Sequence, residues 1–483
     1  MHSPTPCLYP LPTREWGALG LGAARRAVLW LRWFAVVCCL SACATLPDVS
    51  ALGAPDMGAS STQSPTVVDT SGEMGAKGAR SLLGRRWKNS FADTAVLARQ
   101  EEIATSKPLI AGNKLTLLYD GPQTMAAMMD AIRIAKNHIN LETYIFDQDA
   151  VGVAFADLLI EKQRAGVAVH IMVDAVGTMS TPAIFLQRMR DAGIQLQEFN
   201  PISPWRQAGP WEPNHRDHRK VLVVDGRVGF TGGVNISNTY ANSSLFRSKS
   251  RKTAKTGWRD THIQIEGPSV AALQWEFLNH WSQQDAPALA DSDFFPVLAP
   301  QGNQLVRVVA SEPDGDQEIY KSYILAIRLA KKSVHITSAY FVPDPQILKA
   351  LTDAAGRGVD VKLVLPGMKE NDLAYYAGHA YFAEMLGHGI RLYQLQQSVL
   401  HAKTAVIDAL WSTVGSANID TRSFLHNYEL NLVVYDPVLG QAMEDAFQED
   451  LRLSTEVNGA TWDARSRTDK FKEWLARQFG YWL

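Results

Sequence analysis

Two copies of one short motif carry the residue types in this chain that could do chemistry. Each copy places a lysine two residues after a histidine, an aspartate five residues after that lysine, and an asparagine ten residues further on. The members are His218, Lys220, Asp225 and Asn235 in the first copy and His401, Lys403, Asp408 and Asn418 in the second, at a constant offset (401 − 218 = 183). Imidazoles can act as nucleophiles or as general acids and bases, and lysines can hold anionic oxygens. Because the two copies agree at all four positions, a chance repeat is improbable.

The residues after His218 predict how the motif is held. Val221–Val224 is a short apolar run typical of a strand, Asp225-Gly226 is a hairpin-turn signal, and Val228–Thr231 continues as the returning strand. Residues two apart on a strand point to the same face, so His218 and Lys220 are expected to face one point in space. On the same count the aspartates of both copies point away from that point, which indicates a role in the scaffold rather than in proton transfer.

The segments before the first motif alternate between strands and helices. The expected strands are Leu115–Tyr119, Ile139–Phe146 and Val167–Val173, and the expected helices between them are Gln123–Lys136 and Val151–Ala165. Such alternation predicts parallel pairing of the strands in an α/β layered fold.

The chain then repeats itself. Ala131–Lys136 reappears in similar form as Ala326–Lys331, and the order of the elements follows the same plan. We therefore predict two similar α/β/α layered domains, residues 113–292 and 304–454, that form a pseudo-two-fold dimer within one chain. Each domain would supply one motif to a shared cleft.

The duplicated motif with its trailing glycine and asparagine resembles the signature of the phospholipase D superfamily. Further segments are similar to bacterial cardiolipin synthases. These segments are Leu141–Phe146, Asp217–Lys220, Tyr340–Asp344 and Val414–Phe424. The resemblance covers residues 113 to about 454 and implies two phospholipase D-like domains that act on phospholipids.

The resemblance also implies a role for each motif residue. His218 would be the nucleophile that forms a phosphohistidine and His401 the general acid and later the general base, with the reverse assignment left open. The groups that would bind the phosphoryl oxygens are Lys220, Lys403, Asn235 and Asn418. We expect no metal or other cofactor, because the lysines supply the charge and the sequence offers no carboxylate cluster around the motifs.

A neutral nucleophilic histidine needs an acceptor that fixes its other ring nitrogen. Asp260 and Glu429 are the candidates, since each opens the strand that follows the turn of a motif. The alternative is that both are ordinary carboxylates at strand edges. The sequence favours the orienting role for Glu429 and leaves both interpretations open for Asp260.

The amino terminus has the layout of a secretory signal. Arg25-Arg26 precede a short apolar run that ends in Leu40–Cys43, which resembles the lipobox of bacterial lipoproteins. We therefore expect a signal peptide over residues 1–43, a lipid-modified Cys43, and a flexible tether over residues 44–100, in which Ser90–Ile103 forms a short helix that leads into the body. The protein would be lipid-anchored in the bacterial cell envelope, facing the periplasm, with the outer membrane as the expected address. The alternative is an uncleaved apolar helix with an incidental cysteine.

Several functions remain open at this point. The leading hypothesis is a membrane-anchored phosphatidyltransferase that joins two phosphatidylglycerols, or phosphatidylglycerol and another phospholipid, into cardiolipin. Its rivals are a phospholipase D hydrolase, a periplasmic nuclease with the same site, and a non-catalytic protein that has kept the fold. The formal net charge of −2 gives no global basic field and disfavours a nucleic-acid partner. The oligomeric state stays open.

Three segments are candidates for contact with a membrane surface. Trp205 and Trp211 flank a proline-containing loop, Ser248–Lys255 is a basic loop, and the tail over residues 455–483 carries aromatic residues near helical spacing among basic ones. Each has an ordinary alternative, which is core packing for the tryptophans, a solvated loop for the basic run, and docking on the body for the tail.

Overall fold

The computed structural model describes residues 45–53, 64–203, 212–241, 257–284, 286–289 and 292–483. Residues 46–483 form one compact unit. Within the described ranges, no helix combines the length and the apolar character needed to cross a membrane. The expected signal peptide with Cys43, the two tryptophans Trp205 and Trp211, and the basic loop Ser248–Lys255 lie outside the described residues.

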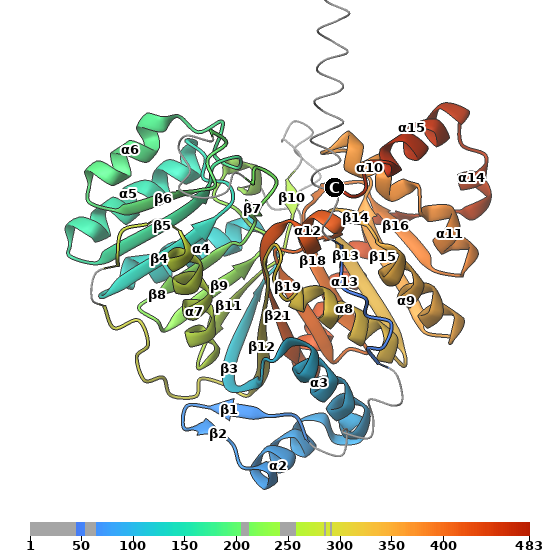
Figure 1. Ribbon diagram of the computed structural model, residues 1–483, viewed down its shortest axis with the longest axis horizontal. Coiled ribbons are helices and arrows are strands. Elements are labelled where there is room, and N and C mark those ends of the chain that lie inside the picture. Colours follow the sequence, from blue (N-terminus) through green and yellow to red (C-terminus); the bar gives the residue numbers. More distant parts are fainter. Residues whose placement is uncertain (1–44, 54–63, 204–211, 242–256, 285, 290–291) are drawn as a thin grey trace, which may run out of the picture. The chain divides into compact units, whose positions relative to one another are not determined.

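The first half is a mixed sheet with helices on both faces (Figure 1). Its strands, in hydrogen-bonding order, are β6 (Gln195–Phe199), β5 (Ala168–Asp174), β4 (His138–Thr143), β8 (Val221–Val224), β9 (Val228–Gly232), β11 (His262–Glu266) and β3 (Leu109–Leu118). Its helices are α4 (Gly121–Ile134), α5 (Ala150–Arg164), α6 (Ala183–Asp191) and α7 (Ser269–Gln283). The pairs from β4 to β6 are parallel, and the other pairs in this half are antiparallel. One of the antiparallel pairs, β8 and β9, is the hairpin that follows His218.

The second half repeats this plan. Its strands, in hydrogen-bonding order, are β12 (Gln304–Ser311), β21 (Asn427–Tyr435), β19 (Trp411–Gly415), β18 (Lys403–Ile407), β13 (Ser333–Ser338), β15 (Asp360–Pro366), β16 (Arg391–Leu395) and β22 (Ser454–Glu456). Its helices are α8 (Glu318–Leu329), α9 (Pro345–Gly356), α10 (Asp372–His379), α11 (Phe382–Gly387), α12 (Thr421–Leu425) and α13 (Pro437–Arg452).

The two halves join through their first strands. β3 pairs antiparallel with β12, so that one sheet runs through both halves. Beneath this joint, one apolar cluster draws on both halves, with Val221, Ile263 and Leu273 from the first and Val308 and Leu432 from the second. The predicted α/β fold with two similar layered domains in one chain is therefore confirmed.

The segment before the first half is not the tether that the sequence suggested. Residues 67–105 contain β1 (Val67–Asp69), β2 (Gly72–Glu73), α2 (Ala76–Trp87) and α3 (Phe91–Thr105). Leu83, Trp87 and Ala98 on these helices are buried in the core of the second half. The prediction of a flexible tether is thus wrong for residues 76–87, whose few apolar side chains gain their partners only in the folded chain, whereas the short helix expected over Ser90–Ile103 is present as α3.

A buried ion pair fastens α3 to the second half. The carboxylate of Glu101 pairs with the guanidinium of Arg307, and both side chains are fully buried. Glu101 also accepts hydrogen bonds from the hydroxyl of Tyr435 at 2.6 Å and from the indole of Trp411 at 3.3 Å. Removing one member of a buried, hydrogen-bonded pair leaves the other charge without compensation.

We expect the substitution Glu101→Ala to lower the free energy of unfolding by about 3–5 kcal/mol. The measurement is urea unfolding followed by circular dichroism. The matched control is Glu384→Ala on α11, whose side chain is exposed and should change stability by less than about 0.5 kcal/mol. Equal, small changes in both variants would contradict the assignment of Glu101 as a structural anchor.

The C-terminal tail docks by one face and leaves another face open. Its helices are α14 (Gly459–Asp463) and α15 (Arg467–Arg477). Ala476 packs against Val342 and Ala377 of the second half. On the other side of α15, Phe471 and Trp474 are more than half exposed, at 59% and 58%. Docking on the body therefore accounts for one face of this helix and leaves its aromatic face in solvent.

Candidate active site

Both motif histidines are positioned by short strands that pair with strands of the opposite half. These strands are β7 (Arg216–Asp217), which pairs with the start of β21, and β17 (Val399–Leu400), which pairs with β10 (Trp258–Arg259). The backbone N–H of His218 donates to the carbonyl of Tyr428 at 3.0 Å, and that of His401 donates to the carbonyl of Arg259 at 2.8 Å. Each motif is therefore tied to a strand of the opposite half.

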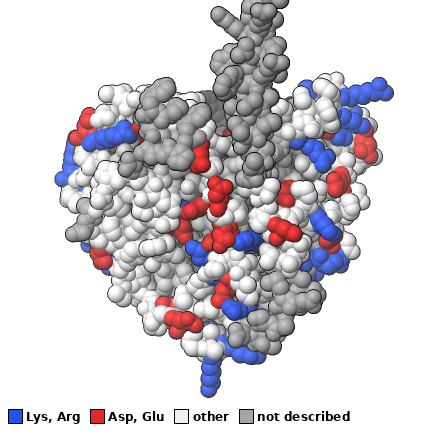
Figure 2. Space-filling model, in the orientation of Figure 1, with Lys and Arg blue, Asp and Glu red and all other residues white. Residues whose placement is uncertain are grey.

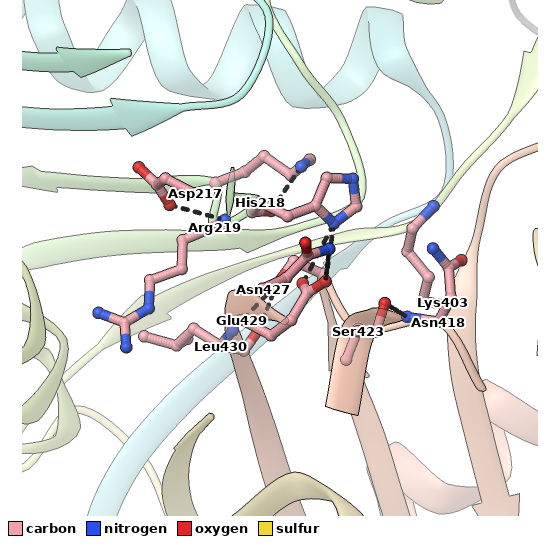
Figure 3. A network of polar contacts seen from close by, with 12 residues as sticks. Asp217, His218, Arg219, Lys403, Asn418, Ser423, Asn427, Glu429 and Leu430 are labelled. Atoms are coloured by element: carbon pink, nitrogen blue, oxygen red, sulfur yellow. Dashed lines mark hydrogen bonds and ion pairs between the residues drawn. The ribbon is translucent and has the colours of Figure 1, made fainter. Parts of the chain in front are cut away.

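His218 is held by a carboxylate from the second half. Its Nδ1 lies 3.0 and 3.1 Å from the two carboxylate oxygens of Glu429, which points from β21 to the imidazole ring (Figure 3). Glu429 is fully buried and also accepts a hydrogen bond from the side-chain amide of Asn427 at 3.1 Å. An acceptor at Nδ1 fixes the proton there and leaves the lone pair on Nε2 free.

His401 is held in the same way by a carboxylate from the first half. Its Nδ1 lies 2.8 Å from Oδ2 of Asp260, which is fully buried. The two carboxylates are 169 positions apart (429 − 260 = 169) rather than 183, because the first half has a longer segment between its asparagine and its carboxylate. The structure therefore places both candidate orienting residues on motif histidines, each on the histidine of the other half.

Both imidazoles open onto one cavity of about 320 Å³. The residues of the first half that line it are Tyr144, Ile145, Arg216, His218, Asn235, Tyr240 and Trp258, and those of the second half are Tyr340, Glu370, Asn371, His401, Asn418, Asp420, Arg422, Ser423 and Asn427. Aromatic side chains support the two histidines: the ring of Tyr144 packs edge-on against His218 with centroids 5.2 Å apart, and Trp258 lies 5.0 Å from His401.

The electrostatics of the site favour a neutral His218. Burial, with the positive charges of Lys220 and Lys403, lowers the pKa of His218 to about 4, although Glu429 opposes this shift. Burial would raise the pKa of Glu429, but the contact with His218 and the charge of Lys220 hold that pKa at about 2. Burial and the charge of Lys403 also lower the pKa of His401. At neutral pH the carboxylate is therefore ionised and His218 keeps an unprotonated nitrogen.

The two motif lysines lie beside the histidines and are buried. The amino group of each donates to the backbone carbonyl of its own motif histidine. Burial, together with the charge of Lys403, lowers the pKa of Lys220 to about 7, while Glu429 opposes this shift. Burial likewise lowers the pKa of Lys403. An anion bound between the histidines would stabilise the charged form of both lysines.

The two motif asparagines line the cavity, and each also serves the backbone. The side-chain oxygen of Asn235 accepts from the N–H of Ile145 at 3.1 Å, and that of Asn418 accepts from the N–H of Tyr340 at 3.3 Å. The amide nitrogen of Asn235 donates to the hydroxyl of Tyr240 at 2.8 Å. In Figure 3, Asn418 lies next to Lys403 on the side of the site away from Arg219. Each asparagine thus has a fixed orientation, with amide hydrogens left for a ligand.

The motif aspartates lie away from the cavity. Asp225 accepts hydrogen bonds from the backbone N–H groups of residues 136–138, and Asp408 accepts them from those of residues 331–333. Both carboxylates therefore tie the hairpin turn of their motif to the start of a neighbouring strand. These contacts agree with the scaffold role expected from the strand period for the two aspartates.

A cluster of acidic side chains lies behind the first motif, contrary to the expectation that none would be found there. Glu142, Asp217 and His280 offer oxygen and nitrogen atoms that all lie within 4.8 Å of one another and could hold a metal ion. Burial raises the pKa of Glu142 to about 7 and that of Asp217 well above its ordinary value. A proton can thus neutralise the carboxyl pair. None of the three lines the cavity.

Two cationic residues of the cavity wall were missed at the sequence level. Arg216 precedes the first motif histidine by two residues, and Arg422 follows the second motif asparagine by four. Neither position belongs to the duplicated pattern, so spacing gave no reason to select it. The aromatic wall residues Tyr144 and Tyr340 fell within segments noted for their resemblance to a family but were not assigned to the site.

Comparison with known proteins agrees with this arrangement. Residues 128–248 and 323–451 match the family model described as cardiolipin synthase, PLD-like domain. The chain is 34% identical over 346 residues to cardiolipin synthase 2 of Bacillus cereus, a match that covers 71% of this chain and 65% of that protein. It is also 34% identical over 383 residues to cardiolipin synthase A of Pseudomonas syringae pv. syringae, with 77% of each chain covered.

A solved structure supports the fold. The crystal structure of phosphatidylserine synthase from Haemophilus influenzae superposes with a TM-score of 0.59 at 13% sequence identity and covers 79% of this chain and 98% of that one. Each of the two segments that match the family model contains one histidine–lysine–aspartate motif. The chain therefore belongs to the cardiolipin synthase family of proteins with phospholipase D-like domains.

Proposed function

We propose that this protein is a phosphatidyltransferase that makes cardiolipin from two phosphatidylglycerols through a phosphohistidine on His218. The observation that carries the proposal is the pair of buried imidazoles on one cavity, each held at Nδ1 by a carboxylate of the opposite half. Family membership supports the choice of phospholipid as substrate. The low pKa of His218 supports its role as the nucleophile, because an attacking nitrogen must be unprotonated.

In the first step Nε2 of His218 attacks the phosphorus of phosphatidylglycerol. The bond between nitrogen and phosphorus forms as the bond from phosphorus to the glycerol oxygen breaks, and the protonated Nε2 of His401 gives its proton to that oxygen. The anionic phosphodiester favours this protonated state of His401, and Asp260 stabilises the resulting charge. The lysines and asparagines neutralise and position the non-bridging oxygens.

In the second step the hydroxyl of a second phosphatidylglycerol attacks the phosphorus. Its proton passes to Nε2 of His401, and the electron pair of the breaking bond between phosphorus and nitrogen returns to His218. The product is cardiolipin, and the only other product of the two steps is glycerol. Water in place of the second lipid would give phosphatidic acid.

The function is tested by incubating the purified full chain with phosphatidylglycerol micelles and identifying the products by mass spectrometry. Cardiolipin together with released glycerol is the expected result, and phosphatidic acid as the sole lipid product would replace the synthase with a hydrolase. A parallel incubation with EDTA should give the same rate, since the proposed steps use only side chains. Loss of activity with EDTA would direct attention to Glu142, Asp217 and His280 as a metal site.

The proposed roles predict a pH profile for kcat/KM with two limbs. On the acid side the rate should rise as pH increases through about 4, where His218 loses its proton and becomes a nucleophile. On the alkaline side it should fall first as His401, whose pKa burial and Lys403 hold below its ordinary value, loses the proton that the leaving oxygen needs. It should fall further as pH increases through about 7, where Lys220 loses the charge that binds phosphate. The variant Lys220→Arg keeps its charge at all these pH values and should lack the limb at about 7. An unchanged alkaline limb in this variant would contradict the assignment to Lys220.

We further propose that α15 rests on a membrane surface. Its exposed aromatic residues Phe471 and Trp474 are accompanied by Lys470 and Lys472, and Figure 2 shows Lys and Arg side chains gathered over this part of the molecule. Exposed aromatic groups with neighbouring cations suit the interface of an anionic bilayer. Such a contact would supply the enzyme with its lipid substrates.

We also propose that Cys43 carries a lipid anchor and that the protein faces the periplasm. The basis is the match of Leu40–Cys43 to a lipobox after a short apolar run. In bacteria grown with a radiolabelled fatty acid, the wild-type chain should become labelled and sediment with membranes, whereas Cys43→Ser should not be labelled. Cys38→Ser serves as the matched control and should behave as the wild type. Equal labelling of all three would contradict the anchor.

A further inference from the structure

Two arginines on the cavity wall break the pseudo-two-fold symmetry of the site. The motif contributes one histidine, one lysine and one asparagine from each half, as expected for groups that surround one phosphate. At the same offset Arg216 corresponds to Val399 (399 − 216 = 183), and Arg422 corresponds to Thr239 (422 − 239 = 183). Both arginines line the cavity, and neither counterpart does. The cavity therefore has a cationic side that the duplicated chemistry does not require.

Arg216 is buried with hydrogen-bonding capacity left over. It is 2% exposed, and its Nη2 donates to the carbonyl of Asn200 at 3.0 Å. Its Nε and Nη1 donate to no acceptor among the described residues. Nη1 forms a long ion pair with Asp174 at 3.5 Å, and this carboxylate already accepts backbone N–H bonds from Asp217, Val176 and Gly177. Burying a guanidinium with unmet donors is costly, so a ligand that satisfies them is expected.

Arg422 is held in place on the same wall. One guanidinium nitrogen, Nη1, donates to the side-chain oxygen of Asn214 at 3.2 Å and to the carbonyl of Trp482 at 3.1 Å. These contacts fix the side chain before any ligand arrives, which reduces the entropy cost of binding. Arg216 and Arg422 are close enough that the charge of Arg422 adds to the effect of burial in lowering the pKa of Arg216, against the opposing charge of Asp174.

The arginine pair lies on the His218 side of the cavity. The charges of both arginines lower the pKa of Tyr144, against the burial and the nearby Asp174 that raise it. The ring of Tyr144 contacts His218 edge-on. Two acids, Glu370 and Asp420, also line the cavity, but Asp420 is occupied in part by capping α12 through the N–H of Ser423 at 2.7 Å. Carboxylates suit the hydroxyl groups of a glycerol and repel a phosphate, whereas the guanidinium pair attracts one.

We propose that Arg216 and Arg422 bind a second phosphodiester, that of the acceptor lipid, next to the phosphorus on His218. This inference rests on the proposed function and adds a physical reason why the protein would use a phospholipid rather than water as the acceptor. In the product one glycerol bridges the two phosphates, so the acceptor phosphate must lie within the same cavity as the first, one three-carbon bridge away. A guanidinium matches the planar, two-oxygen face of a phosphodiester. Water carries no phosphate and gains nothing from the pair, which favours transfer over hydrolysis.

The test compares two soluble acceptors that differ in the phosphodiester. The full chain is given phosphatidylglycerol as donor, with either glycerophosphoglycerol or deuterated glycerol as acceptor. The two transfer products, phosphatidyl-glycerophosphoglycerol and deuterated phosphatidylglycerol, differ in mass from the donor and are quantified by mass spectrometry. The wild type should prefer glycerophosphoglycerol. In Arg422→Gln and Arg216→Gln this preference should fall at least about 10-fold, the value of one charge-assisted hydrogen bond. Transfer to glycerol should stay within about 3-fold of the wild type, because a 3-fold change in rate corresponds to less free energy than one such hydrogen bond contributes.

Controls separate binding from folding. Arg391→Gln removes one positive charge from an exposed position that does not line the cavity and should leave the preference unchanged. Arg422→Lys keeps the charge and should retain part of the preference. Arg422 is only partly buried, so its variants test the proposal even if Arg216→Gln fails to fold.

Two results would overturn the inference while leaving the proposed function intact. In one, the Arg422→Gln variant loses transfer to both acceptors equally, which indicates a structural role. In the other, the variant keeps the full preference. By contrast, a wild-type protein that transfers to neither acceptor and forms only phosphatidic acid would refute the proposed function itself, and the inference with it.

Discussion

Replacing His218 by alanine is expected to abolish formation of both cardiolipin and phosphatidic acid, with kcat lowered on the order of 10⁴-fold or more. The reason is that both products derive from the same phosphohistidine, whose nitrogen the variant lacks. The measurement is product formation from phosphatidylglycerol by mass spectrometry. His388→Ala is the matched control, because His388 is an exposed histidine of the second half and should leave the rate unchanged.

His401→Ala should behave differently from His218→Ala and so reveals which histidine is the nucleophile. A donor with p-nitrophenol as leaving group needs no proton from a general acid, so His401→Ala should still release one equivalent of p-nitrophenol and accumulate the phosphoenzyme. His218→Ala should release none. The opposite pattern would exchange the roles of the two histidines and leave the remainder of the mechanism in place.

The second large effect is expected at Glu429. Glu429→Gln should lower kcat by roughly 10²- to 10⁴-fold, because the amide cannot stabilise the charge on His218 during attack and can present its N–H to Nδ1 in the wrong tautomer. This loss should persist with the p-nitrophenol donor, since it affects the nucleophile. The control is Glu266→Gln on β11, a carboxylate of the first half that lies outside the cavity.

Asp260→Asn should show the complementary pattern. Asp260 holds His401, the proposed general acid, so the fall in kcat should be large with phosphatidylglycerol and small with the p-nitrophenol donor. Together the two variants test whether each half orients the histidine of the other. If the histidine variants identified His218 as the nucleophile, but Glu429→Gln spared the first step and Asp260→Asn blocked it, the crossed assignment of carboxylates to histidines would be refuted.

The exchange of carboxylates has a structural cause. The strand that ends just before His218 pairs with the strand that carries Glu429, and the strand that ends just before His401 pairs with the one that ends just before Asp260. Each catalytic unit of histidine and carboxylate therefore exists only where the two halves meet. Neither half by itself contains a complete unit.

Local sequence was sufficient for the parts of the fold that depend on short-range chemistry. Short apolar runs and the Asp-Gly turn predicted the hairpin after His218, and the structure has β8 and β9 there with Asp225 and Gly226 at positive φ. The second hairpin has Asp408 and Ala409 at positive φ without a glycine. Its turn was recognisable only because the motif repeats, since alanine gives no turn signal.

Prediction failed where a segment gains its partner from far along the chain. The helix expected over Ser90–Ile103 is present as α3, but its docking on the second half was not predicted, because it depends on contacts such as Glu101 with Arg307, more than two hundred residues away. The acidic cluster of Glu142, Asp217 and His280 likewise assembles from three separate elements. No periodicity or spacing within a short window records such contacts.

The sequence by itself identified the candidate reacting groups, because a duplicated histidine, lysine and asparagine at fixed spacing is a local pattern that survives without knowledge of the fold. It also determined the two-domain α/β plan, through alternating strands and helices and their repetition. Only the tertiary structure decided which carboxylate serves which histidine and that Asp225 and Asp408 belong to the scaffold. It alone brought Arg216 and Arg422 to one wall. The physical reason is that these relations arise from pairing between strands of opposite halves, which depends on the packing of the whole chain.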